Sequence, residues 1–270
     1  MPHAPAAERW AECLAGWAIP DHILQAAPES PFYFPPELFA AIAREALDTT
    51  EVSASRRRAA EAVPPGGSVL DVGCGGGAAS LPLAPPAGLL VGLDPSEEML
   101  VEYARLAERL ADERGAAHSE VLGGWPDVAD DAPTVDVVVC HNVVYDVPDL
   151  PPFVEALTAH ARRRVVVEMS ADHPTMPMGV LWKAIHGIER PARPTADDAI
   201  EVLTDMGLDV GVERFTRQWN HVHERSQRVA FLRRRLCVGP ERDAEIDALL
   251  TPEIASPIRE VVTLWWDTGV

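Results

Sequence analysis

Lysine is almost missing from this sequence, and basic side chains of either kind are few. The 270 residues contain 23 Lys and Arg against 42 Asp and Glu, which gives a formal net charge of −19. Lys183 is the one lysine, so the other 22 cations (23 − 1) are arginines. A protein that binds nucleic acid or an anionic membrane needs a basic surface, so this charge disfavours both partners.

Paired cysteines and long apolar runs are also missing. No apolar run reaches the roughly 18–20 residues that span a bilayer, and the first ten residues lack the charged and apolar segments of a secretory signal. His221 and His223 alternate as on a strand, but no third ligand lies nearby, so we expect no metal site. The four cysteines form no CxxC pair and no zinc spacing: Cys13, Cys74, Cys140 and Cys237. We therefore expect a protein of the reducing cytoplasm.

The sequence divides at the turn Pro64-Pro65-Gly66-Gly67. Residues 1–65 have helical spacing interrupted by a proline-rich stretch, 28–36, and predict an N-terminal helical cap. This stretch holds Phe32-Tyr33-Phe34, which we interpret as an aromatic lid, with ordinary packing of the cap as the alternative. The second part, 66–270, is predicted to be the ligand-binding domain.

Short apolar runs alternate with helical segments after that turn. Apolar strands that alternate with helices are typical of a parallel sheet covered on both faces. The predicted strands are 68–72, 89–93, 120–122, 135–140, 164–169, 210–216 and 261–266, and the helices among them are 96–113, 150–161, 196–206 and 224–237. We therefore predict an α/β fold with a doubly wound sheet.

A glycine loop follows the first strand, and an acid ends the second. The loop is Gly73-Cys74-Gly75-Gly76-Gly77, and Asp94 lies 21 residues (94 − 73) after Gly73. Glycines permit a sharp turn and a close ligand, and an acid at this distance can accept hydrogen bonds from ribose hydroxyls. The same pattern suits a nicotinamide dinucleotide, so it leaves an NAD(P)-dependent oxidoreductase open.

Three features favour a different nucleotide ligand. Asp71 precedes the loop, where a carboxylate suits an ammonium group and would oppose a pyrophosphate. Pro82, Pro85 and Pro86 make a long helix after the loop doubtful. A Tyr-x-x-x-Lys pair for hydride transfer is impossible, because Gly179 stands four residues before the one lysine.

The motifs resemble those of class I S-adenosylmethionine-dependent methyltransferases. The resemblance rests on Val69–Gly77, on Leu90–Leu100 with Asp94-Pro95-Ser96, and on the segment Val135–Leu150 around the fourth strand. It implies a Rossmann-like seven-stranded sheet, mostly parallel, whose last strand is antiparallel. It also implies S-adenosyl-L-methionine as cofactor.

The resemblance further implies a set of cofactor contacts. Gly73 and Gly75 would touch the methionine part, Asp94 the ribose and Met99 the adenine. Trp125 stands where many relatives carry an acid, and it either covers the adenine or closes the core. The full predicted set is Asp71, Gly73, Cys74, Gly75, Asp94, Pro95, Met99, Gly124, Trp125, Cys140 and His141.

Candidates for the methyl acceptor's site lie mainly at the carboxyl ends of the fourth and fifth strands. His141 has a near-neutral pKa that suits a general base, so we predict it as the catalytic residue, with a backbone contact to the cofactor as the alternative. The predicted acceptor-site residues are Tyr33, Tyr145, Glu168 and His173. The sequence thus predicts methyl transfer to O, N or C of a small molecule, and leaves a non-catalytic S-adenosylmethionine-binding module open. It does not identify the acceptor or the oligomeric state.

Overall fold

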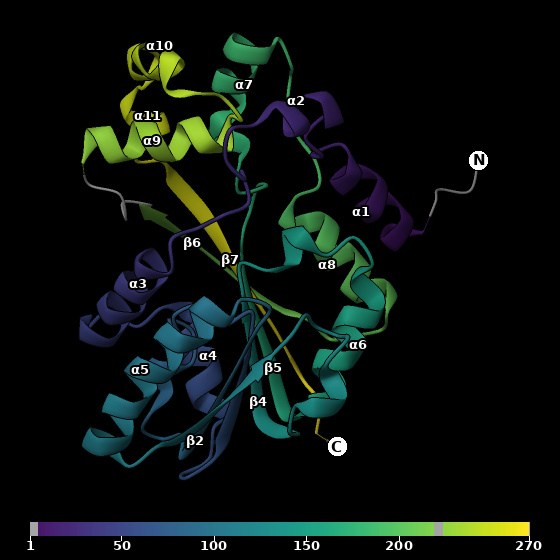
Figure 1. Cartoon of the computed structure of the whole chain (residues 1–270). Coiled ribbons are helices and arrows are strands. Elements are labelled where there is room, and N and C mark those ends of the chain that lie inside the picture. The colour runs from purple at the N-terminus through teal and green to yellow at the C-terminus, as the bar shows by residue number, and fades with distance from the viewer. Residues whose placement is uncertain (1–4, 219–223, 270) are drawn as a thin grey trace.

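The computed structural model describes residues 5–218 and 224–269, and a seven-stranded sheet forms its centre. The strand order is β3-β2-β1-β4-β5-β7-β6. β1 to β5 are parallel, and β7 lies antiparallel between β5 and β6 (Figure 1). The strands are β1 (Ser68–Val72), β2 (Leu89–Asp94), β3 (Ala117–Leu122), β4 (Val135–His141), β5 (Ala161–Ser170), β6 (Gly211–Gln218) and β7 (Ile258–Asp267). The predicted fold class, a mostly parallel seven-stranded sheet with an antiparallel last strand, is confirmed.

Helices cover both faces of the sheet. One face buries α1 (Ala6–Ala15), α6 (Leu150–His160) and α8 (Ala196–Asp205), and the indole Nε1 of Trp10 anchors α1 by donating to the carbonyl of Val147 at 2.8 Å. The other face packs against α3 (Pro36–Asp48), α4 (Ala54–Ala62) and α5 (Glu97–Arg114). These two apolar layers explain why the central strands are buried on both sides.

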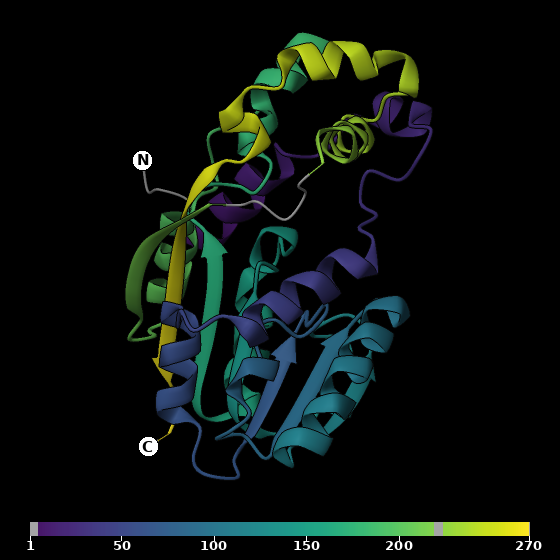
Figure 2. The ribbon, with the colours of Figure 1, turned by 90° about the vertical axis from the view of Figure 1, so that its left-hand side faces the viewer.

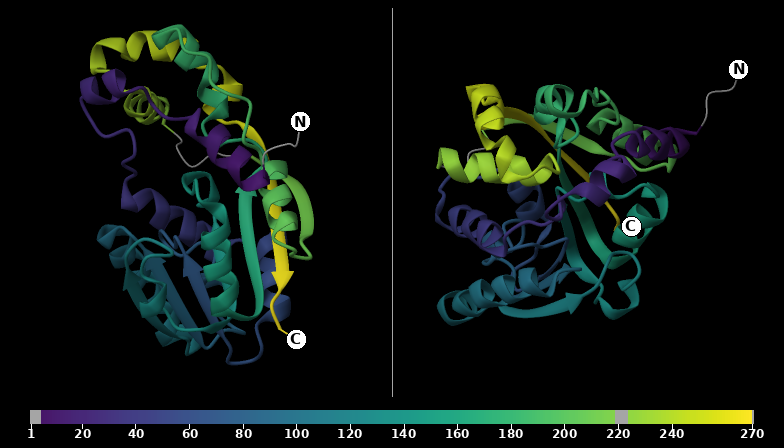
Figure 3. Two further views of the ribbon diagram at one scale, coloured as in Figure 1. Left: turned by 90° about the vertical axis from the view of Figure 1, so that its right-hand side faces the viewer. Right: turned by 45° about the horizontal axis from the view of Figure 1, so that its top comes forward.

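A third apolar cluster forms a cap beyond the carboxyl ends of β1–β5 (Figure 2). The cap combines α2 (Asp21–Ala26) with α7 (Gly179–His186), α9 (Arg225–Arg235), α10 (Asp243–Leu249) and α11 (Pro252–Ala255). Its core includes Ile23, Trp182 and Leu232, so it joins segments that are far apart in the sequence. The two further views show the same arrangement (Figure 3). The division of the chain at residue 65 stays a prediction.

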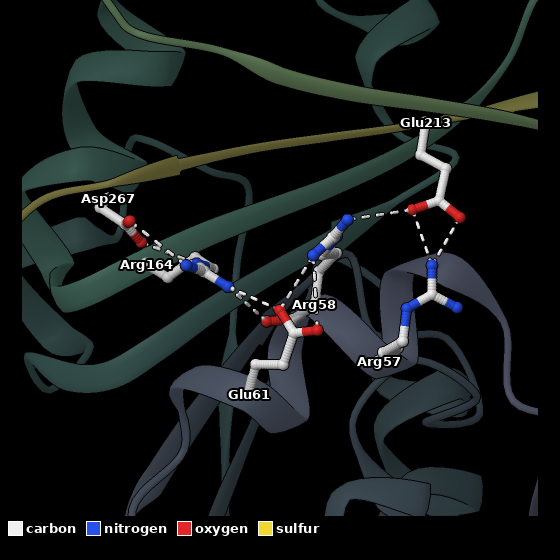
Figure 4. Close-up of polar contacts among 6 residues, drawn as sticks. All are labelled: Arg57, Arg58, Glu61, Arg164, Glu213 and Asp267. Atoms are coloured by element: carbon white, nitrogen blue, oxygen red, sulfur yellow. Dashed lines mark hydrogen bonds and ion pairs between the residues drawn. The ribbon is translucent and has the colours of Figure 1, made fainter.

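Ion pairs hold α4 against the sheet (Figure 4). Arg57 donates to Glu213 at 2.7 Å, and the Arg58 guanidinium lies 4.2 Å from the ring centroid of Trp265. The paired residues come from α4, β5, β6 and β7: Arg57, Arg58, Glu61, Arg164, Glu213 and Asp267. Because these contacts fix the helix axis, they also fix the start of α4, which reaches the site described below.

Lys183 lies on the cap helix α7, where 66% of its side chain is exposed and it pairs with Glu189. Within 5–218 and 224–269, no helix is both long and apolar enough to cross a membrane. The predicted His221/His223 pair lies outside the described residues.

Candidate cofactor site

The glycine loop leaves β1 at the carboxyl edge of the sheet and turns back on itself. Gly73, Gly75 and Gly77 have φ values of +73°, +49° and +89°, a region that side chains other than glycine rarely adopt. The N–H groups of Gly73 and Cys74 both donate to the carbonyl of Leu93, at 2.8 and 3.0 Å. The loop is therefore tied to the end of β2 and needs no ligand to hold its shape.

The carboxylate of Asp94 joins the glycine loop to the start of the next helix. Its Oδ2 accepts the N–H of Gly75 at 2.9 Å, and its Oδ1 accepts the N–H of Ser96, also at 2.9 Å. Burial raises the pKa of Asp94, and the two backbone hydrogen bonds oppose that rise. A carboxylate offers about four acceptor positions, so about two remain for the hydroxyls of a ribose. The loop and Asp94 are thus joined by a hydrogen bond, and the contact of Asp94 with a ribose stays a prediction.

No α-helix follows the loop. Residues 78–88 form turns and the short 3-10 helix η1 (Leu81–Leu83), after which Pro85 and Pro86 follow cis peptide bonds. A pyrophosphate needs free N–H groups at the start of a helix. Here the N–H groups of residues 73–75 are occupied and the helix is missing, so the site does not fit a dinucleotide.

Asp71 lies beneath the loop and is 1% exposed. Its Oδ2 accepts the hydroxyl of Ser80 at 2.6 Å. Burial raises the pKa of Asp71 and the nearby charge of Asp94 adds to the rise, while the hydrogen bond from Ser80 opposes it; together these effects bring the pKa to about 7. The carboxyl group is therefore half-protonated near neutral pH, and a cation placed over the loop would ionise it.

The end of β4 packs directly on the glycine loop. A Cβ added to Gly73 would lie 2.3 Å from Val143, so only glycine allows the two loops this close. Asn142 takes a φ of +59° and donates its N–H to the carbonyl of Glu168 at 2.7 Å. This contact places His141, at the end of β4, beside the loop.

His141 and Glu168 lie opposite each other in the β4–β5 register. The imidazole Nε2 is buried and has no hydrogen-bond partner among the described residues. Burial lowers the pKa of His141, and Arg217 lowers it further against the effect of Glu168. The ring is therefore neutral at neutral pH and can accept a proton, as a general base must.

Glu168 is 2% exposed and is held from two sides. The Ser55 hydroxyl donates to its Oε2 at 2.6 Å, and Arg217 donates to its Oε1 at 2.9 Å. Burial would raise its pKa, but His141, Arg217 and Ser55 together keep it below the usual value. Because its oxygens are already bound, Glu168 orders the site around His141.

Other predicted cofactor contacts line the same edge or pack behind it. Met99 is 9% exposed at the start of α5, and Pro95 is exposed just before that helix. Gly124 has open space where a Cβ would be. Cys74 and Cys140 are buried thiols whose pKa values burial raises.

Trp125 packs away from the loop. Its Nε1 donates to the carbonyl of Phe153 at 3.3 Å, and its ring meets His160 edge-on with centroids 4.9 Å apart. Both contacts lie on α6, so they support the core-closing alternative. The adenine contact of Trp125 stays a prediction.

Of the predicted acceptor-site residues, Tyr145 and His173 lie together, with ring centroids 5.2 Å apart in an edge-on contact, and within the part of the chain that the structure describes no contact brings Tyr33 to them. Tyr145 is 5% exposed, and its hydroxyl donates to the carbonyls of Ser170 and Ala171, both at 3.0 Å, which leaves it a structural role. His173 stacks on Trp17 with centroids 3.8 Å apart and lines a pocket of about 90 Å³. Tyr33 is 45% exposed on the link between α2 and α3, beneath the guanidinium of Arg234.

Three residues that make contacts at the site were missed in the sequence: Phe39, Ser55 and Arg217. A Cβ on Gly76 would lie 2.5 Å from the carbonyl oxygen of Phe39, and the Phe39 ring borders Gly75, so α3 covers the loop. Ser55 and Arg217 reach Glu168 from 113 and 49 residues away in sequence. No local motif marks such partners. Among the residues that the structure describes, no group of three or more His, Cys, Asp or Glu could hold a metal ion.

Comparisons with known proteins agree with this geometry. Residues 70–167 match the sequence profile of a family described as a methyltransferase domain. This segment of the chain is therefore similar to methyltransferase domains. The match covers most of β1, all of β2 and β4, and the glycine loop with Asp71 and Asp94.

The curated proteins that this chain is similar to include one with a named activity. A ubiquinone biosynthesis O-methyltransferase of Azorhizobium caulinodans is 38% identical over 85 residues, 32% of each chain. An uncharacterized protein of Haemophilus influenzae is 32% identical over 146 residues, 54% of this chain and 52% of that one. The chain thus spans about half, or less, of these relatives' own length.

A solved structure supports the fold. A protein of Bacillus halodurans C-125, described as a candidate methyltransferase, aligns with a TM-score of 0.56 and 16% identity over 82% of this chain and 100% of that one. At this identity the likeness concerns the fold alone.

Proposed function

We propose that this protein transfers a methyl group from S-adenosylmethionine to a small molecule. The observation that carries the proposal is the closed glycine loop, tied to Asp94 and followed by no helix. In this arrangement the Asp94 carboxylate can still accept hydrogen bonds from the hydroxyls of a ribose. The loop offers no site for the pyrophosphate of a dinucleotide. The cofactor supplies an electrophilic methyl group when bound.

The residues at this edge have separate roles in the proposal. Asp94 accepts the ribose hydroxyls, and Asp71 stabilises a cationic amino group above the loop. Neutral His141 takes the proton of the acceptor if the acceptor is protonated at neutral pH. Phe39 and the covering helix α3 exclude water from the loop, which a displacement at a sulfonium requires.

Three features support the proposed acceptor and the proposed compartment. A net charge of −19 disfavours nucleic acid, so a small acceptor fits better. The relative from Azorhizobium is named as an O-methyltransferase, which makes an oxygen atom the first acceptor to test. The four cysteines are free thiols, consistent with action in the reducing cytoplasm.

Calorimetric titration with S-adenosylhomocysteine and with NADH tests the cofactor. We expect S-adenosylhomocysteine to bind and to raise the melting temperature, and NADH to do neither. Stabilisation by NADH alone would refute the proposal in favour of an oxidoreductase. A methyl-donor consumption assay over a metabolite panel then separates an enzyme from a binding module, because the module would bind the cofactor tightly without turnover.

The role of Asp94 needs a sharper test, because Asp94 also holds the loop. Asp94→Ala should weaken S-adenosylhomocysteine by the loss of charged hydrogen bonds, about 1.5–3 kcal/mol or roughly 10- to 150-fold. The 2′,3′-dideoxy analogue lacks the ribose hydroxyls, so its affinity should fall much less. Asp131→Ala, at an exposed acid, is the matched control. Equal losses for both ligands would mean that Asp94 only shapes the loop.

His141 is tested by turnover. His141→Asn should lower kcat by about 10²- to 10⁴-fold while S-adenosylhomocysteine affinity stays within a few fold. Unchanged kcat would support the alternative in which only its backbone contacts the cofactor.

A further inference from the structure

Residues 27–35 join α2 of the cap to α3 beside the glycine loop, and we call them the link. In Figure 2 the link runs down from α2 to α3. Its backbone is held weakly: the N–H of Phe32 donates to the Ser30 hydroxyl at 3.3 Å, and the N–H of Tyr33 donates to the Ser30 carbonyl at 3.4 Å. Three of its residues are prolines, which have no N–H to donate. A segment with so few backbone hydrogen bonds can open locally, and side chains of other elements must hold it in place.

Arg234, near the end of α9, holds the first part of the link. Its Nη2 and Nε both donate to one oxygen of Glu29, at 2.6 and 2.9 Å. Its guanidinium also lies 5.2 Å from the ring centroid of Tyr33, which is a cation–π distance. The Arg234 and Glu29 side chains are 25% and 45% exposed, so solvent screens their attraction. A contact of this kind is weak enough to break and form again.

Arg235, the last residue of α9, holds the next part of the link. It donates to the carbonyl of Pro31 at 2.7 Å, and its guanidinium lies 4.4 Å from the ring centroid of Phe34. Burial lowers the pKa of Arg235, and the charge of Asp146, which follows β4, opposes that shift. The end of α9 therefore lies near both the link and the segment that continues from β4.

Phe34 connects the link to the helix that covers the glycine loop. Its ring meets Phe39 edge-on with centroids 5.7 Å apart, and it meets Phe231 of α9 with centroids 6.0 Å apart. Phe39 lies on α3, and a Cβ added to Gly75 would lie 3.0 Å from its ring. Phe32, in contrast, is 65% exposed. The contacts thus run from α9 through Phe34 and Phe39 to the glycine loop.

The body of α3 is anchored independently of the link. Ala40 and Ala43 are fully buried, and Ala43 belongs to the apolar layer on this face of the sheet. Release of the link from α9 would therefore leave α3 in place and would break only the aromatic contact near the start of the helix.

We propose that the link is a strap, held on α9 by Arg234 and Arg235, which must leave α9 before S-adenosylmethionine can enter or leave. The contacts on α9 are polar and partly exposed, whereas the contact with Phe39 is apolar, so the end on α9 is the one that opens. This inference rests on the proposed function for the identity of the cofactor. It assigns the predicted aromatic lid a fixed partner, which is the end of α9.

The rates of cofactor exchange test the strap. The contacts of Arg234 are made to the link and not to Gly73 or Asp94, so weakening them should change how fast the cofactor exchanges rather than how tightly it binds. In stopped-flow tryptophan fluorescence with S-adenosylhomocysteine, we expect Arg234→Gln to raise the association and dissociation rate constants together, by about 2- to 10-fold. The Kd should change by less than about twofold, because a gate acts equally on entry and exit.

Two further variants make the comparison specific. Glu29→Gln should raise both rate constants as Arg234→Gln does, and the double variant should add little, because both substitutions break one contact. Arg225→Gln is the matched control: it breaks the pair of Arg225 with Asp247 on the same helix and leaves the link untouched. It should exchange S-adenosylhomocysteine at the wild-type rate.

Chymotrypsin measures the opening of the strap without any ligand. Cleavage after Phe32 or Tyr33 requires the link to leave α9, and its rate follows the population of the open form when opening is fast. Arg234→Gln should be cut there about 2- to 10-fold faster than the wild type, whereas Arg225→Gln should be cut at the wild-type rate.

Three outcomes would overturn the inference. Unchanged rate constants in Arg234→Gln and Glu29→Gln would do so, and so would equal chymotrypsin cleavage of Arg234→Gln and the wild type. Faster dissociation with an unchanged association rate would do so as well, because it would mean that these residues contact the cofactor itself. Failure of S-adenosylhomocysteine to bind the wild-type chain would refute the proposed function instead, and the chymotrypsin comparison would still show whether Arg234 holds the link.

Discussion

Asp71 should make the stability of this protein fall as the pH rises toward neutrality. Its carboxyl group is 1% exposed, and its pKa is raised from 3.8 to about 7. Between those two pKa values the folded chain keeps a proton that the unfolded chain has lost. The free energy of unfolding therefore decreases over this range with rising pH, and above about pH 7 Asp71 has no further effect.

The magnitude follows from the size of the shift. Each pKa unit corresponds to about 1.4 kcal/mol. The free energy of unfolding should therefore fall by about 2–3 kcal/mol as the pH rises from roughly 5 to 7. The replacement Asp71→Asn keeps an oxygen that can accept the Ser80 hydroxyl, and it does not titrate. Any cost of burying the amide changes the stability of the variant by the same fixed amount at every pH. Such a change shifts the plot of the stability difference between wild type and variant against pH, but it leaves the slope of that plot unchanged.

Urea unfolding of the wild type and Asp71→Asn at roughly pH 5 to pH 8 measures this difference. The stability of the wild type relative to the variant should fall by about 2–3 kcal/mol across the range and then level off. Asp131→Asn, which alters an exposed carboxylate, should show a flat difference. A flat curve for Asp71→Asn, or one that rises with pH, would refute a buried and protonated Asp71. Saturation with S-adenosylhomocysteine should shrink the effect if its ammonium group lies over the loop.

Three further substitutions test the packing around the site. Gly76→Ala places a Cβ 2.5 Å from the carbonyl oxygen of Phe39 and should cost about 1–3 kcal/mol in urea unfolding, so an unchanged midpoint would contradict the close approach of α3. Ser55→Ala removes the 2.6 Å hydrogen bond to buried Glu168 and should cost about 1–3 kcal/mol, with Ser55→Thr as a partial rescue. Trp10→Phe loses the 2.8 Å indole bond to the chain before α6 and should lower stability by about 1 kcal/mol, whereas no loss would mean that water replaces the bond.

The strands could be predicted because their sequence is apolar on both faces. The predicted range 68–72 matches β1, and most other strands agree within a few residues. β3 is the exception: it lies at the edge of the sheet with mostly exposed side chains, so only 120–122 of Ala117–Leu122 gave an apolar signal. The bounds of α4 were missed because its Arg- and Ala-rich sequence gives only a weak apolar stripe.

The parts of the candidate site that lie close together in the sequence could be predicted. The parts that come from distant segments of the chain could not. The glycine loop and Asp94 follow consecutive strands, so their spacing in sequence reflects their proximity in space. Glu168 was visible as an acid near the end of β5, but its partners Ser55 and Arg217 come from α4 and β6. Their positions depend on the packing of those elements on the sheet, which no short motif encodes. The composite cap was hidden for the same reason.

The near-absence of lysine has a practical consequence. Lys183 stands on α7 of the cap with two-thirds of its side chain in solvent, and it pairs with the exposed Glu189. An amine-reactive fluorophore would therefore attach to the folded chain at a single internal position, besides the α-amino group, without any engineered cysteine. The label would report directly on the distance between the cap and a fluorescent nucleoside seated over the glycine loop.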